Sequence, residues 1–133
     1  MTARRALLAP LAVGVLIVTL GGCGSPERLS VGEGEIPESV PDDFPVPADA
    51  TVGASVVDRE KHATEFSLDL PRGVEQAAEY YLVNLVSSGY VVETSAGDAT
   101  RWNIRFSRET LRGTVRIEAG ESGCGVVVNI NRS

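Results

Sequence analysis

A single helical stripe, set among segments that alternate in polarity, constrains the fold of this chain more than any other feature. Apolar side chains recur at the spacing of one helix face at Val74, Ala77, Ala78, Tyr81, Leu82, Leu85 and Val86. This spacing predicts one amphipathic helix over residues 74–86. Glu75 lies in its first turn, where the helix dipole favours an anion, and Gly89 is expected to end the helix as a left-handed residue.

Segments of alternating apolar and polar residues surround the helix, and this alternation predicts half-buried strands. The predicted strands are residues 51–57, 62–70, 90–93, 102–106, 113–118 and 124–131. In the first of them, Val52, Ala54 and Val56 are expected to share one side. We therefore predict an α+β domain over residues 48–133. Its antiparallel sheet has the element order ββαββββ, and the one amphipathic helix packs on one face.

The first 22 residues are typical of a signal peptide. Arg4 and Arg5 precede an uncharged apolar run that ends at Leu20. That run of about 15 residues is shorter than the roughly 20 that a membrane-spanning helix needs. The charged start, the short apolar middle and the small residues at the end predict a cleaved segment over residues 1–22 rather than a permanent span.

The stretch Leu20-Gly21-Gly22-Cys23 resembles the lipobox of bacterial lipoproteins, in which an aliphatic residue and two small residues precede a cysteine. The resemblance implies that the Cys23 thiol carries diacylglycerol and that Cys23 becomes the first residue of the mature chain. Two acyl chains anchor a protein stably, so this implies a location on the outer face of the cell membrane. An ordinary secretory signal that ends near a cysteine is the alternative. Arg greatly outnumbers Lys in this chain, which suggests a GC-rich coding bias. Together with the lipobox, this composition resembles that of an actinobacterial lipoprotein.

The segment that follows, residues 23–47, is predicted to be a disordered, acidic tether rich in Pro and Gly. Its apolar residues are sparse and without period, although Phe44 and Val46 are placed where order is expected to begin. A calcium site is the alternative for its acids, but the spacing of an EF-hand is absent. A proline-rich ligand for an aromatic groove is the other alternative.

The charge of the mature chain excludes some partners. The full sequence has 12 Lys and Arg and 18 Asp and Glu, and removal of Arg4 and Arg5 with the signal leaves a net charge of −8. This balance argues against nucleic-acid binding, which needs clustered positive charge. It also argues against electrostatic docking on anionic lipid, so the lipid on Cys23 is expected to be the membrane attachment.

No residue pattern in the chain predicts catalysis, and we expect no catalytic residue, metal site or cofactor. His62 is the single histidine and has no metal-ligand or catalytic partner at a characteristic spacing. Cys124 shares its parity with Val126 and Val128, which predicts a core position. An intermolecular disulfide or a redox role is the alternative for Cys124. The chain is therefore expected not to be an enzyme.

Two binding functions remain. The first is a non-enzymatic interaction module that uses a polar sheet face, predicted from Asn103, Arg105, Arg116 and Asn129, to bind a protein or a cell-wall polymer. The second is a carrier of a small apolar ligand between helix and sheet, next to Tyr81, Trp102 and Phe106. A solvated face and a packed core are the respective alternatives. The pattern is also similar to small extracytoplasmic lipoprotein domains, a likeness that assigns no function.

Overall fold

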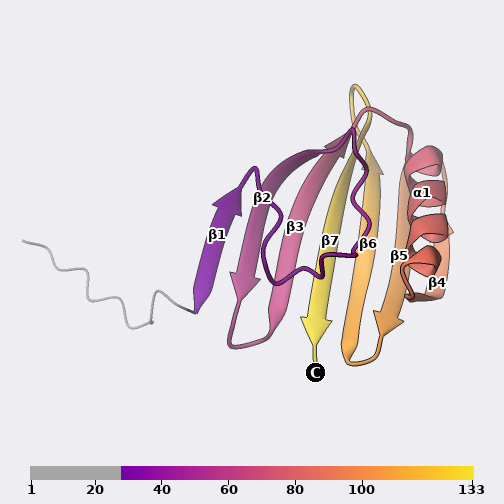
Figure 1. Cartoon of the computed structure of the whole chain (residues 1–133). Helices are drawn as coiled ribbons and strands as arrows, with labels where there is room; N and C mark the ends of the chain where they lie inside the picture. Colours follow the sequence, from indigo (N-terminus) through magenta and orange to yellow (C-terminus); the bar gives the residue numbers. More distant parts are fainter. Residues whose placement is uncertain (1–27) are drawn as a thin grey trace, which may run out of the picture.

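The fold is one antiparallel sheet with a single helix. The computed structural model describes residues 28–133, and the predicted signal peptide and Cys23 lie outside these residues. The elements are β1 (Leu29–Glu33), β2 (Thr51–Asp58), β3 (Ala63–Leu70), α1 (Val74–Ser87), β4 (Val91–Gly97), β5 (Arg101–Arg108), β6 (Leu111–Ala119) and β7 (Cys124–Arg132). The seven strands lie in the order β1-β2-β3-β7-β6-β5-β4, and each neighbouring pair is antiparallel (Figure 1). Among the described residues, no helix is both long and apolar enough to cross a membrane.

The expected α+β class, with one antiparallel sheet and one helix, is confirmed. The element order differs from the predicted ββαββββ because an additional strand, β1, precedes the others and pairs with β2. Helix α1 packs mainly on β4, β5 and β6, so it covers part of one face of the sheet (Figure 1).

Helix α1 follows its predicted stripe closely. Its buried residues are Val74, Ala77, Ala78, Tyr81 and Leu85. The buried stripe ends one residue early, at Leu85, since Val86 is 60% exposed. Gly89 has φ of 87°, and the amides of Gly89 and Tyr90 donate to the carbonyls of Val86 and Leu85. These two bonds form a Schellman motif, which explains why a glycine stands at this position.

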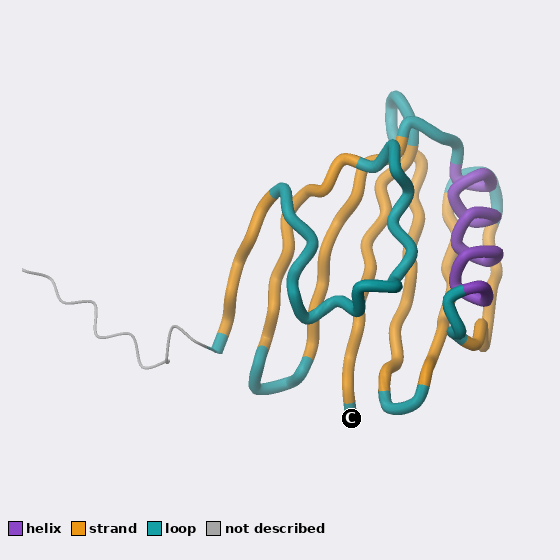
Figure 2. Tube along the Cα trace, viewed as in Figure 1, coloured by secondary structure: helices purple, strands orange, loops and turns teal. Residues whose placement is uncertain are grey.

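Residues 34–50, here called the strap, cover the rest of the same face. The strap leaves β1, crosses in front of β2, β3 and β7, and returns to the start of β2 (Figure 2). Three of its amides, those of Val40, Phe44 and Ala50, donate to carbonyls three residues earlier. Each acceptor is a proline, Pro37, Pro41 or Pro47, which keeps its carbonyl although it has no N–H. The strap is thus a series of tight turns.

The prediction of a disordered tether over residues 23–47 is therefore wrong for its described part, residues 28–47. Leu29–Glu33 forms strand β1, and Val40 and Phe44 are each only 5% exposed in the core. Composition alone suggested too little apolar surface to offset the entropy of ordering. A few buried side chains such as Val40 and Phe44 supply that surface, because they pack on a part of the sheet that the helix leaves uncovered.

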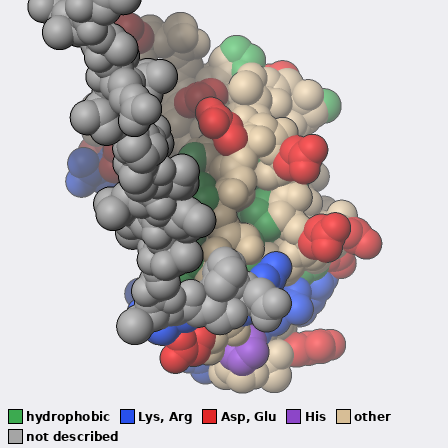
Figure 3. Space-filling model, turned by 90° about the vertical axis from the view of Figure 1, so that its left-hand side faces the viewer, with side chains coloured by type: hydrophobic (Ala, Val, Ile, Leu, Met, Phe, Trp, Pro, Cys, Tyr) green, Lys and Arg blue, Asp and Glu red, His purple; other side chains and the backbone are tan. Residues whose placement is uncertain are grey.

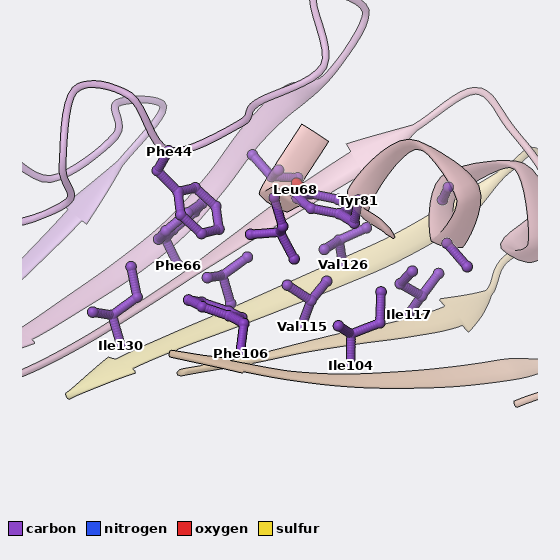
Figure 4. Close-up of a cluster of buried hydrophobic side chains, with 14 of the residues drawn as sticks. Phe44, Phe66, Leu68, Tyr81, Ile104, Phe106, Val115, Ile117, Val126 and Ile130 are labelled. Carbon is purple, nitrogen blue, oxygen red and sulfur yellow. The ribbon is translucent and has the colours of Figure 1, made fainter. Parts of the chain in front are cut away.

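Phe44 is the centre of the core on the strap side. Its ring lies 5.6 Å from the ring of Phe106 and 6.0 Å from that of Phe66, centroid to centroid. The rings of Tyr90 and Tyr81 follow at 5.9 and 6.3 Å, so Phe44 joins strands, helix end and strap. Figure 4 shows Phe44 entering from the strap above Phe66, among side chains that rise from the sheet.

One clamp around Arg108 holds the strap near Phe44. The Arg108 guanidinium donates to both carboxylate oxygens of Asp43, at 2.6 and 3.1 Å. The same group donates to the Ser88 carbonyl at 2.9 Å and lies 4.2 Å from the centroid of the Tyr90 ring. The hydrogen bond from Arg108 holds the pKa of Asp43 below its usual range. Strap, helix end and sheet therefore meet at one side chain.

Three further hydrogen bonds fasten the ends of the strap. Near its beginning, the hydroxyls of Ser39 and Thr64 are 2.6 Å apart, and Arg132 Nη2 donates to the Ser39 carbonyl at 3.1 Å. Near its end, Arg72 Nε donates to Asp49 Oδ2 at 2.9 Å. Because these partners come from β3, β7 and the turn before α1, the strap is tied across the width of the sheet.

The side chains of β2 do not keep the alternation that the sequence suggests. The register shifts between Val52 and Ser55, where Ser67 Oγ donates to the Ala54 carbonyl at 3.3 Å. This bulge turns the following residues over, so Ser55 is 5% exposed and Val56 is 43% exposed. The expectation that Val52, Ala54 and Val56 share one side is therefore wrong.

Candidate interaction surface

The second face of the sheet is open, because α1 and the strap both lie on the first (Figure 1). The sheet register brings the four predicted residues together on this open face. Asn103 pairs directly with Arg116, and Arg105 pairs with Thr114, which in turn pairs with Asn129. They stand on three neighbouring strands, β5, β6 and β7, and both arginines are exposed.

The open face is divided by charge into two halves. On β5 and β6 it has four basic side chains, Arg101, Arg105, Arg112 and Arg116, and one acidic side chain, Glu118. On β2 and β3 it has three acidic ones, Asp58, Glu65 and Asp69. Strand β7 lies between the halves and contributes the uncharged residues Gly125, Val127, Asn129 and Asn131. The residue pattern of β5 and β6 predicts the basic half. The acidic half was not predicted, although the parity of residues 65–69 places Glu65 and Asp69 opposite the core.

The arginines of the basic half are available to a partner. Arg101 and Arg116 approach Glu118 only to 3.7 Å, and their side chains are 72% and 55% exposed. Such exposed pairs contribute little to stability and are exchanged easily. A guanidinium offers a planar set of donors that matches a carboxylate or a phosphate. The basic half is therefore suited to bind an anionic group.

An apolar corner adjoins the acidic half. Val31 of β1 pairs with Val56 of β2, and these side chains are 79% and 43% exposed. Leu29 lies on the same strand and is 54% exposed. The bulge in β2 creates this corner, since it turns Val56 outward. No periodicity in residues 51–57 indicates it.

His62 and Cys124 lie at opposite ends of the sheet. His62 is exposed in the turn between β2 and β3, with φ of 51°. It borders a cavity of about 300 Å³ together with Ser39, Thr64 and Arg132. Cys124 begins β7 and is 4% exposed, in agreement with the core position that its parity predicted. Burial raises the pKa of the Cys124 thiol and so disfavours the nucleophilic thiolate.

Side chains fill the interface of helix and sheet, the expected site of an apolar ligand. Tyr81 and Phe106 are each 0% exposed, and Ile104 and Ile117 beside them reach at most 1%. Trp102 is half-buried at the periphery of the core, where its Nε1 donates to Ser95 Oγ at 2.9 Å. These aromatic residues therefore pack the core.

A groove that the sequence did not predict lies between the strap and the β1–β2 edge. It has a volume of about 750 Å³. Ser30, Gly32 and Ser55 line it from the strands, and Glu35 and Glu38 line it from the strap. It exists because the strap, which was expected to be a tether, folds back over the sheet.

Within residues 28–133, no group of three or more His, Cys, Asp or Glu side chains is arranged to hold a metal ion. Comparisons of the chain with protein-family models, with curated proteins and with solved structures found no match.

Proposed function

We propose that this protein is a lipoprotein held on the outer face of a cell membrane by diacylglycerol on Cys23. The stretch Leu20-Gly21-Gly22-Cys23, after a short apolar segment, supports this proposal. In the bacterium that makes the protein, Cys23→Ser should abolish labelling by radioactive palmitate and release the chain from the membrane fraction. The mass of the mature N-terminal peptide checks the same point. Labelling that persists in Cys23→Ser would contradict the assignment.

We further propose that the domain is a non-enzymatic interaction module and that its open sheet face binds the partner, a protein or a cell-wall polymer. The observation that supports this most is the alignment of Arg105 and Arg116 on neighbouring strands of an uncovered face. The partner surface that complements this basic half is anionic. The exposed position of His62 and the buried thiol of Cys124 favour binding over catalysis.

Crosslinking in intact cells, followed by purification of the tagged protein, tests this face. The double variant Arg105→Glu/Arg116→Glu should lose its crosslinked partner, because it opposes anionic groups with like charge. The variant Arg105→Lys/Arg116→Lys keeps the charge and should retain part of the partner. Val83→Glu is the control for position, since Val83 is 58% exposed on the outer side of α1. Unchanged recovery of every partner by the double Glu variant would show that the open face is not the binding surface.

A further inference from the structure

The described fold begins close to the cysteine that we propose to be lipidated. Strand β1 starts at Leu29, six positions after Cys23. An extended chain advances at most about 3.6 Å per residue, so the Cα atoms of Cys23 and Leu29 are at most about 22 Å apart. A long flexible tether would have allowed any orientation of the domain. This short connection requires that the end of the sheet where β1 starts be close to the bilayer.

Antiparallel pairing determines which other segments lie at that end. Leu29 pairs with Asp58, and Ala63 pairs with Asn131, while Arg108 pairs with Leu111. The start of β1, the β2–β3 turn, the β5–β6 turn and the C-terminal end of β7 therefore share one end of the sheet, the lower end in Figure 1. We call this end the lower rim. It comprises residues 28–29, 58–63, 108–112 and 131–133.

The lower rim has most of the cations of the described chain. Residues 28–133 have ten Lys and Arg residues, and six of them belong to the lower rim: Arg28, Arg59, Lys61, Arg108, Arg112 and Arg132. The acidic side chains of the lower rim are Asp58, Glu60 and Glu109. Figure 3 looks onto the β1 edge and shows most of the blue side chains at the lower end, beside the purple histidine.

The opposite end of the sheet is acidic. It comprises the ends of β1, β3 and β6, the start of β5 and the loops between them. Its acidic side chains are Glu33, Glu35, Asp49, Asp69, Asp98, Glu118 and Glu121, and its basic ones are Arg72 and Arg101. The net charge of −8 therefore conceals a strong separation of charge along the strands. An anionic surface would attract one end of this domain and repel the other.

We propose that the lower rim docks on anionic lipid headgroups and that the strands stand upright on the membrane. This inference rests on the proposed attachment at Cys23, which brings the rim within reach of the bilayer. Arg28 is paired with Glu60, and Arg108 with Asp43. Lys61 lies in the β2–β3 turn and Arg112 lies at the start of β6, and both side chains are exposed. These two side chains are the contacts to the phosphate groups of the lipid.

The upright orientation has a consequence for the open face. Arg105 and Arg116 lie on two antiparallel strands that stand upright on the membrane, so the open face is perpendicular to the bilayer and accessible from the side. The acidic end points away from the anionic surface. Lipid docking thus uses the lower rim and partner binding uses Arg105 and Arg116 above it, and Arg112 lies where the two surfaces meet.

Attachment of the chain to vesicles through Cys23 tests the docking independently of lipidation in the cell. The chain from Cys23 to Ser133 is coupled to a maleimide-bearing lipid, and peptide masses confirm that the buried Cys124 has not reacted. Hydrogen exchange is then compared on vesicles of phosphatidylcholine and of phosphatidylcholine with phosphatidylglycerol. One cation near an anionic leaflet gains ~1 kcal/mol, which corresponds to about a fivefold factor. We expect exchange in the turns at residues 59–62 and 109–110 to be about fivefold slower on the anionic vesicles.

Two single charge reversals at opposite ends of the sheet serve as a matched pair. Lys61→Glu should bring exchange in both turns to within about twofold of that on neutral vesicles. Arg101→Glu, an equal change of charge at the acidic end, should leave the slow exchange in place. Sodium chloride at about 0.5 M should abolish the difference between the vesicles, since the Debye length is then only a few Å.

Three results would overturn the proposal. They are equal exchange on both kinds of vesicle, slow exchange in the opposite turns at residues 97–101 and 120–123, and slow exchange that salt does not change. The last would indicate docking through the apolar corner of Leu29 and Val31. None of them bears on palmitate labelling of Cys23, which tests the anchor separately.

Discussion

Helix α1 and the strap cover the same face of the sheet, and they bury their side chains by different means. Helix α1 presents a periodic stripe over β4, β5 and β6, and its Tyr81 and Leu85 are both 0% exposed. The strap reaches 5% exposure at Val40 and Phe44 with no period at all. A helix satisfies its own backbone, whereas the strap depends on turns and on side chains of distant strands. A segment without secondary structure can therefore be as much a part of a core as a helix is.

The largest expected effect compares one anchor from each cover. Phe44→Ala should destabilise the domain by about 3–5 kcal/mol, because it leaves a cavity among four aromatic rings. Leu85→Ala in α1 should cost about 2–5 kcal/mol. Urea unfolding of both variants measures the difference. A cost below about 1 kcal/mol for Phe44→Ala would mean that the strap is not packed as firmly as the helix.

A second pair of variants compares the residue that ends α1 with a proline in a turn of the strap. Gly89→Ala should cost about 1–2 kcal/mol, because φ of 87° is unfavourable for a residue with a Cβ. The added Cβ would meet only Arg108 Cδ at 3.9 Å, so the cost lies in the backbone. Pro41→Ala should cost about 0.4–1 kcal/mol, since it enlarges the conformational freedom of the unfolded chain. Thermal unfolding ranks the two variants, and the reverse order would contradict this account of the turns.

The Arg108 clamp makes the strap sensitive to acid. The hydrogen bond from Arg108 lowers the pKa of Asp43 in the folded state, so the contact stabilises the fold above the unfolded value of about 3.9. That contribution is lost as the pH falls through the lower folded pKa. Asp43→Asn should therefore reduce the acid dependence of stability measured by urea unfolding between about pH 2 and pH 5.

Asp98 provides the control for this pH dependence. Its pKa is also lowered, chiefly by the hydrogen bond from the Thr100 hydroxyl, but it lies in the β4–β5 turn away from the strap. Asp98→Asn should change the acid dependence without changing proteolysis in residues 34–50, whereas Asp43→Asn should expose the strap to protease. Identical cleavage of the two variants at acid pH would show that Asp43 does not hold the strap.

The smallest expected effect concerns the apolar corner outside both covers. Val31 is 79% exposed on β1, so Val31→Lys should change the free energy of unfolding by no more than about 0.5 kcal/mol. Val40→Ala, a truncation of a buried strap residue, should cost more. If Val31→Lys were the more harmful variant, β1 would be packed against something that the fold of residues 28–133 does not include.

Residues that were predicted well are those whose environment follows from neighbours in sequence. The helix was predicted at 74–86 and extends over Val74–Ser87, and each of the six expected strands is present. The face formed by Arg105, Arg116, Asn103 and Asn129 was also predictable, because parity within each strand separates inward from outward residues. The bulge at Gly53 and Ala54 interrupts that parity, and the alternation of residues 51–57 gave no indication of it.

By itself the sequence determined the amphipathic helix, the alternating strands and the open polar face, because local spacing alone decides which side chains can share a surface. Only the tertiary structure decided that residues 29–50 belong to the domain and that the cations gather at the end where β1 starts. Phe44 is buried because Phe66, Tyr90 and Phe106 come together around it, and Asp43 is held because Arg108 arrives from β5. Those partners are far away along the chain. Composition counts residues but does not tell where they meet, so an acidic, proline-rich segment was expected to be a tether when it is a cover.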